Sequence, residues 1–192
     1  MPTGVALRDA RRQLFDAAER LLLRAGPHAL TSRAVTTEAG CAKGVLHRHF
    51  ADFDAFLAAL VQERAAAPAE AAATALRARA GTDTVAGNVT DALTGFFTPV
   101  TVALVALITF RDDLRARLRA TTPAGIPVLT EATAALAAYL ADERDRGRLP
   151  ADAAVDVLAP TLTGTAHLLH ADRTTPPPTR EELRRTVATL LP

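Results

Sequence analysis

Apolar side chains recur at helical spacing along almost the whole chain, and runs that alternate every two residues, as strands do, are scarce. Alanine, leucine and arginine are abundant, and all three favour helix. One helical face of residues 7–25 carries Leu7, Leu14, Phe15, Ala18, Leu22 and Ala25, and Gly26 with Pro27 then ends that segment. The pattern therefore predicts an all-α protein.

Two short helices are expected next. Thr31 is placed to cap a helix over residues 32–39, Gly40 ends it, and residues 43–49 can form the second. Two short helices joined by a tight turn and packed on a longer first helix describe a helix-turn-helix module. Residues 1–52 are thus expected to form a three-helix DNA-binding domain.

The second short helix combines an apolar stripe with a basic face. If Val35 packs against Leu46, and Phe50 against Phe15 or Leu22, the exposed positions are Lys43, Gly44, His47 and Arg48. A helix of about two turns can enter a major groove, where lysine and arginine reach phosphates or guanine edges. The alternative is that these residues form only a solvated surface.

The rest of the chain, residues 53–192, is expected to be a second helical bundle. Asp52 can cap a long helix that ends near Gly81, and further helices are predicted at 83–97, 100–120, 124–146, 152–171 and 180–191. Asp152 is a candidate cap for the fourth of these, and Thr179 with Glu182 has capping-box spacing for the last. Residues 92–110 carry no charge, but Gly95 and Pro99 interrupt them, so we expect two buried helices rather than a membrane span.

Charge and cysteine content limit the protein class. The net charge is only +1, with +2 in residues 1–64 and −1 in residues 65–192, which places the basic part in the N-terminal third. The single cysteine allows no intramolecular disulfide, and no secretory signal is recognisable, so a cytoplasmic location is expected. A glycine-rich phosphate loop, a nucleophile elbow and a convincing metal cluster are all missing from the sequence, which argues against an enzyme and predicts no cofactor.

Residues 8–60 resemble the DNA-binding region of TetR-family transcriptional regulators. The matching positions are Arg12, Leu14, Phe15, Ala17, Ala18, Leu22, Gly26, Thr31, Arg33, Ala39, Gly40, Cys41, Lys43, Gly44, Leu46, His49, Phe50 and Asp54. Three positions depart from the family pattern: His47 replaces a tyrosine, Ala42 a serine or threonine, and Phe53 a frequent lysine.

The resemblance implies a homodimeric, ligand-responsive regulator, usually a repressor, that binds double-stranded DNA at a near-palindromic operator. The expected DNA contacts are Thr31, Arg33, Lys43, Gly44, His47, Arg48 and His49. For His49, packing with a polar tip is the competing interpretation. A nonspecific DNA binder and a purely structural helical protein remain alternatives.

The second domain would hold an apolar small-molecule effector and the dimer interface. Candidate pocket residues are Phe96, Phe97, Phe110, Tyr139 and His167, although such aromatic residues are more often core. Candidate interface residues are Leu158, Leu162, Leu169, Leu183, Val187 and Leu190. Cys41 could sense redox changes, and His167 with His170 could share a metal, but packing roles are expected for all three.

Overall fold

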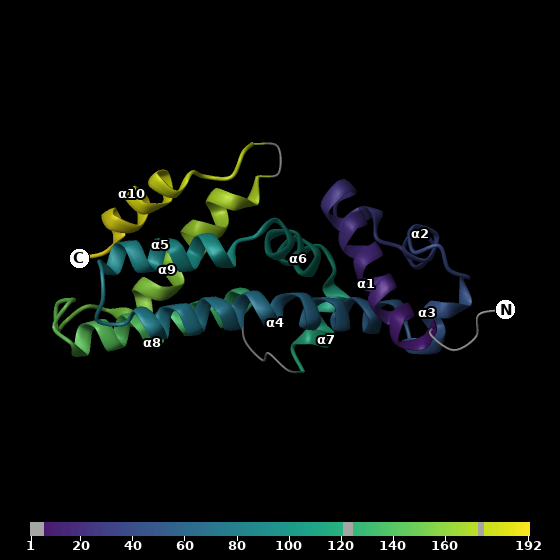
Figure 1. The fold of residues 1–192 in the computed structure, drawn as a ribbon, viewed down its shortest axis with the longest axis horizontal. Coiled ribbons are helices and arrows are strands. Elements are labelled where there is room, and N and C mark those ends of the chain that lie inside the picture. The colour runs from purple at the N-terminus through teal and green to yellow at the C-terminus, as the bar shows by residue number, and fades with distance from the viewer. Residues whose placement is uncertain (1–5, 121–124, 173–174) are drawn as a thin grey trace.

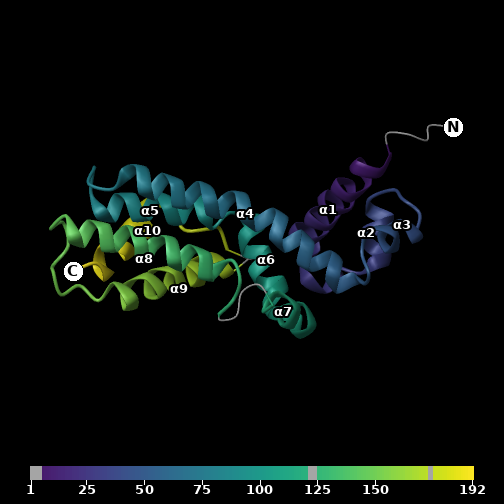
Figure 2. The ribbon, with the colours of Figure 1, turned by 90° about the horizontal axis from the view of Figure 1, so that it is seen from below.

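The computed structural model describes residues 6–120, 125–172 and 175–192, and every regular element in them is helical. Figures 1 and 2 show the α-helices α1 (Ala6–Ala25), α2 (Ser32–Glu38), α3 (Gly44–His49), α4 (Phe53–Arg79), α5 (Val85–Phe96), α6 (Pro99–Phe110), α7 (Asp112–Leu118), α8 (Leu129–Asp145), α9 (Val155–Ala171) and α10 (Arg180–Leu190). A short 3₁₀ helix, η1 (Pro27–Ala29), follows α1. The all-α prediction is confirmed.

Most helix boundaries coincide with their sequence signals. Gly40 ends α2 in the left-handed backbone region at φ 65°. The Asp52 side chain caps α4 by accepting a hydrogen bond from the Ala55 N–H at 2.6 Å. Thr179 and Glu182 form the predicted capping box of α10.

The predicted helix over residues 100–120 is wrong, because the chain breaks it into α6 and α7. Arg111 between them is extended, with φ −118° and ψ 105°. Asp112 and Asp113 open the first turn of α7, where the helix dipole favours acidic side chains.

The helix predicted from residue 152 begins later. Asp152 lies in a turn and does not cap it, and α9 starts at Val155, after Ala154, without a side-chain cap. The predicted start of the preceding helix at residue 124 and the side chain of Leu7 lie outside the described residues; α8 begins at Leu129.

The long helix α4 connects the two ends of the molecule (Figures 1 and 2). Helices α1, α2 and α3 gather around its beginning, and α5 and α8 pack along its second half. Helix α9 packs on α8, and α10 packs on α5. Helices α6 and α7 lie between these groups, and α6 contacts both α1 and α4. A shift of α4, α6 or α7 is therefore in a position to move the N-terminal helices.

An aromatic cluster holds the N-terminal helices on α4. The Phe15 ring centroid lies 5.8 Å from that of Phe50 and 5.5 Å from that of Phe56, which confirms the predicted contact between Phe15 and Phe50. Phe56 belongs to α4, so the core of the N-terminal helices includes the start of the long helix.

The uncharged segment over residues 92–110 forms parts of two helices. Among the described residues no single helix is long and apolar enough to cross a membrane; α5 and α6 reach that length only together, and they are bent by 68°. Their apolar side chains, including Leu93, Leu104 and Leu107, are buried in the protein core.

Candidate nucleic-acid interface and effector groove

The turn between α2 and α3 has the geometry that the sequence predicts. The Thr31 side chain caps α2 by accepting a hydrogen bond from the Ala34 N–H at 3.1 Å. Val35 of α2 and Leu46 of α3 are both fully buried. This apolar contact fixes one face of α3 toward the core and leaves the opposite face to solvent.

The solvent face of α3 is basic. Lys43, Gly44, His47 and Arg48 are exposed, as predicted, and Thr31 and Arg33 are exposed at the start of α2. No ion pair with another described residue involves Arg33, Lys43 or Arg48. Their charges are therefore available for an anionic partner.

Other cations of the N-terminal helices are already engaged. Arg20 and Arg24 of α1 bind Glu38 of α2 at 3.1 and 2.8 Å, and the Arg24 hydrogen bond, followed by that of Arg20, lowers the pKa of this carboxyl group. The Arg11 guanidinium carbon lies 5.2 Å from the ring centroids of Phe15 and Phe50. These contacts stabilise the packing of the N-terminal helices. The cations without an ion pair to a described residue, Arg33, Lys43 and Arg48, lie instead on α2 and at α3.

The side chains of His49 and Cys41 pack against the protein and are not fully exposed to solvent. His49 is half-buried, and its Nε2 atom is buried with no hydrogen-bond partner among the described residues. Cys41 is half-buried, and desolvation raises the pKa of its thiol, which disfavours the reactive thiolate. The packing interpretation is therefore the better one for both side chains.

The departures from the expected pattern have local consequences. Ala42 is exposed, and α3 begins after Lys43 without a side-chain cap. Phe53 stacks on Phe56 with centroids 5.6 Å apart, and the Arg111 guanidinium carbon lies 5.5 Å from its ring centroid. At position 53, packing and the Arg111 cation between α6 and α7 stand where the family resemblance predicts a lysine.

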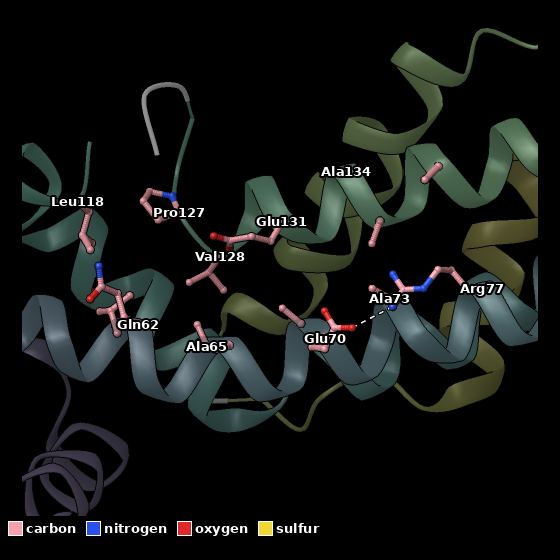
Figure 3. A pocket seen from close by; sticks show the side chains of 15 residues that line it. Gln62, Ala65, Glu70, Ala73, Arg77, Leu118, Pro127, Val128, Glu131 and Ala134 are labelled. Carbon is pink, nitrogen blue, oxygen red and sulfur yellow. Dashed lines mark hydrogen bonds and ion pairs between the residues drawn. The ribbon is translucent and has the colours of Figure 1, made fainter. Parts of the chain in front are cut away.

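A groove of about 670 Å³ runs between α4, α7 and α8 (Figure 3). Its floor and walls consist mainly of small apolar side chains, namely Ala65, Ala66, Ala69, Ala73, Ala134, Ala135 and Ala138. Gln62, Glu70, Arg77 and Glu131 place polar groups along it, and Glu70 binds Arg77 at 2.9 Å. The size and mostly apolar lining are those of a small-molecule site.

None of the five predicted pocket residues lines this groove. Phe96, Phe97 and Tyr139 are buried in the core, and His167 packs near Phe97. Phe110 is 60% exposed on the surface. The missed signal is the alanine-rich stretch over residues 65–75, because small side chains on a helix leave room beside it.

Helix α7 joins the groove to the start of α4. Leu118 lines the groove, and the adjacent Arg117 binds Asp52 at 2.7 Å. Arg111, directly before α7, binds Asp54 at 2.9 Å. Both acids lie at the beginning of α4, a few residues after α3.

A family model identifies the N-terminal helices. The model of bacterial regulatory proteins of the tetR family matches residues 14–60, which include α2, the turn and α3. Residues 14–60 of this chain therefore form a DNA-binding domain of the tetR family. TetR regulators are DNA-binding transcription factors rather than enzymes.

Solved structures of TetR regulators share the fold along nearly the whole chain. NemR from E. coli in its reduced form has a TM-score of 0.73 at 19% identity, covering 95% of this chain and 95% of that one. A TetR-family member from Streptomyces coelicolor A3 has 0.65 at 21%, covering 96% and 99%. FadR from Bacillus subtilis, in complex with stearoyl-CoA, has 0.67 at 16%, covering 93% and 94%. No curated protein sequence matches the chain.

The six predicted interface residues differ in how far the protomer buries them. Leu162, Leu183 and Val187 are at most 2% exposed, so they belong to the protomer's own core rather than to an exposed face. Leu158 and Leu190 are half-buried, and Leu169 is 39% exposed.

A different face of α9 is uncovered. Val157 is 57% and Leu168 is 74% exposed, and the exposed Thr161 and Gly164 lie between them at helical spacing. Among the described residues no group of three or more His, Cys, Asp or Glu side chains could hold a metal. His170 Nδ1 instead lies 2.7 Å from the Ala166 carbonyl oxygen, in keeping with the expected packing role.

Proposed function

We propose that this regulator is a ligand-responsive repressor that binds a near-palindromic operator as a homodimer and is released by a small apolar effector. The observation that carries the proposal is the exposed, unpaired basic face of α3 on a buried apolar stripe. Residues 1–52 bind DNA, and residues 53–192 bind the effector and the second subunit. Asp52, at the start of α4, marks the boundary.

The residues divide by role at the DNA. Lys43 and Arg48, on the side of α3 that faces the DNA major groove, reach guanine edges or phosphates. Thr31 and Arg33, at the start of α2, contact the phosphate backbone. His47 donates a hydrogen bond to a phosphate. In a homodimer the two α3 helices must be about 34 Å apart, one turn of DNA, to bind both half-sites.

The effector site is the groove between α4, α7 and α8. Its alanine-rich wall accepts an apolar molecule, and Gln62, Glu131 or the Glu70–Arg77 pair orients a polar group on it. The stearoyl-CoA complex of FadR is a precedent for a ligand with a long apolar part in this fold.

Release from DNA follows from contacts at α7. An effector beside Leu118 moves α7, and the Arg117–Asp52 and Arg111–Asp54 ion pairs carry that shift to the start of α4 and hence to α3. The effector shifts the equilibrium only by the difference in its affinity for the two arrangements.

Selection of bound duplexes from a random pool, at fixed near-physiological salt, tests DNA recognition. We expect a near-palindromic consensus, with affinity at least about a thousandfold above that for random DNA. Lys43→Ala and Arg48→Ala should each weaken specific binding about tenfold or more, while Arg144→Ala, a matched charge removal on α8, should not. Strong salt-dependent binding without any enriched sequence would support a nonspecific DNA binder instead.

A thermal-shift screen of apolar small molecules tests effector control. A true effector should stabilise the protein and also release the selected operator. Ala134→Trp, which fills the groove from α8, should abolish both effects, whereas Ala151→Trp in an exposed turn should preserve them. If stabilising compounds keep both effects in Ala134→Trp, the groove is not the effector site.

A further inference from the structure

The side chain of Arg64 joins the long helix α4 to α1, the helix on which α2 packs. Its guanidinium forms ion pairs with two carboxylates of α1: Nη2 pairs with Asp16 Oδ1, and Nε lies 2.8 Å from Glu19 Oε2. Figures 1 and 2 show α1 crossing the first half of α4. Arg64 therefore connects two helices that run in different directions.

The Arg64 ion pairs are partly shielded from water. The side chains of Arg64 and Glu19 are 24% and 29% exposed, and that of Asp16 is 46% exposed. Partial burial reduces screening by salt, and the planar guanidinium restricts the orientation of the carboxylates that it binds. Such a contact constrains the relative position of two helices more closely than an exposed lysine pair would.

A second contact between α1 and α4 lies at a distance from the first. The Phe15 ring of α1 packs on the Phe56 ring of α4, with centroids 5.5 Å apart. Arg64 lies about 12 Å further along the axis of α4 than Phe56, given the helical rise per residue. One contact alone lets two crossed helices rotate about it, whereas two separated contacts fix their crossing angle.

The helices proposed to meet DNA are attached to α1. Arg20 and Arg24 of α1 bind Glu38 of α2 at 3.1 and 2.8 Å. Val35 of α2 and Leu46 of α3 are buried in the same core. A rotation of α1 on α4 therefore carries α2 and α3 with it.

We propose that Arg64 is a positioning residue for operator binding: by holding Asp16 and Glu19 it sets the crossing angle of α1 on α4, and thereby the spacing of the two α3 helices in the dimer. The inference rests on the proposed homodimeric repressor. A full palindromic site needs both α3 helices at the correct spacing, whereas a single half-site needs only one of them. Arg64 thus determines which half-site spacings are accepted without touching DNA.

The ratio of the affinities for a full site and for a single half-site tests this role. Arg64→Gln should weaken binding to the full operator about tenfold and broaden the range of accepted half-site spacings, while binding to one half-site stays unchanged. Arg20→Gln removes the same charge but leaves Glu38 paired with Arg24, so its ratio should equal that of the wild-type protein. Loss of folding would weaken binding to both sites together, and circular dichroism checks for it.

Removal of the two acids gives a test in which the charge change is opposite. The double variant Asp16→Asn with Glu19→Gln makes α1 more positive, so electrostatic attraction alone would strengthen binding to both sites. Loss of the Arg64 ion pairs predicts instead that the ratio falls as it does in Arg64→Gln. Arg64→Lys keeps the charge but lacks the planar guanidinium, and its ratio should fall between those of the wild-type protein and Arg64→Gln.

Distances between spin labels measure the orientation of α1 without DNA. Thr37→Cys on α2 and Ala67→Cys on α4, both at exposed positions, carry the labels in a Cys41→Ala chain that is diluted with unlabelled protein. We expect one narrow distance distribution, which broadens or shifts in Arg64→Gln and in the double variant.

An unchanged distance distribution in both variants, or an unchanged ratio of full-site to half-site affinity, would overturn the inference. A wild-type protein that does not prefer a full site over a half-site would contradict the repressor function instead. The distance measurement needs no DNA, so it decides the role of Arg64 in that case as well.

Discussion

Glu143 is the one charged residue that is fully buried in the described part of the chain. Its carboxylate accepts a hydrogen bond from the Gly81 N–H at 2.8 Å and binds Arg148 at 2.5 Å, so it ties the turn after α4 to the end of α8. Removing it takes the acceptor from the Gly81 N–H and the carboxylate from the Arg148 guanidinium, which keeps only the carbonyl oxygens of Gly81, Thr82 and Asp83. We expect Glu143→Ala to lower the free energy of unfolding by about 3 kcal/mol in urea titrations. Asp142→Ala, which breaks an exposed pair with Arg146, should change it little.

Tyr139 lies in the same cluster and gives a pH-dependent signal. Burial, followed by the nearby Glu143, raises the pKa of Tyr139 to about 12, although the Asn88 amide donates to its hydroxyl at 3.0 Å. The unfolded chain ionises near pH 10, so between about pH 10 and 12 it releases a proton that the folded state keeps. The contribution of Tyr139 to stability is therefore constant below pH 10 and falls as pH rises through this window.

Ultraviolet absorbance of tyrosinate measures this directly, because the chain contains one tyrosine and no tryptophan. The folded protein should titrate about two pH units above the urea-unfolded protein, and Tyr139→Phe should lose both the signal and this part of the alkaline destabilisation. Coinciding titrations of the folded and unfolded states would contradict the prediction.

At the scale of the element, α10 is held on α5 by a firm start and two buried side chains. The Thr179 side chain accepts a hydrogen bond from the Glu182 N–H at 3.3 Å, and the Glu182 carboxylate accepts one from the Thr179 N–H at 2.8 Å. Leu183 and Val187 then bury one face of the helix. Thr179→Ala should cost about 1 kcal/mol in urea unfolding. Thr189→Ala removes an exposed hydroxyl that bonds within the helix, and it should cost nothing measurable.

The sequence predicts elements where the cause is local. Gly40 needs a left-handed backbone, and the Thr179–Glu182 spacing is itself a capping box, so both boundaries are readable from a few residues. The break at Arg111 is not, because its extended conformation accompanies contacts with Asp54 and Phe53 on α4, more than fifty residues away in the chain. Periodicity alone continues the helix through that position.

The same distinction separates the two candidate sites. The basic face of α3 follows from helical spacing within one short segment, so Lys43, His47 and Arg48 could be placed in advance. The groove exists only because alanines of α4 and α8 face each other across a gap, which no single segment reveals. The predicted aromatic residues do not mark this groove, since side chains such as Phe96 are buried in the core away from it.

At the scale of the whole molecule, α3 and α9 lie toward opposite ends of α4 (Figures 1 and 2). A second subunit on α9 would leave both α3 helices free to reach DNA. The exposed face of α9 suits such a contact, because Val157 and Leu168 supply apolar area and Gly164 allows a close helix approach.

Leu168→Glu tests this arrangement, because the substitution places a charge within the proposed subunit contact, where it would be desolvated without a partner. The variant should sediment as a monomer with unchanged helical content, and its affinity for a full palindromic site should fall at least about tenfold, since one subunit contacts only one half-site. Phe110→Glu changes another exposed apolar residue outside this face, at 60% exposure, and it should remain dimeric with normal operator affinity. If Leu168→Glu and Val157→Glu both stay dimeric, the subunits meet through another surface, and the spacing of the two α3 helices must be set there.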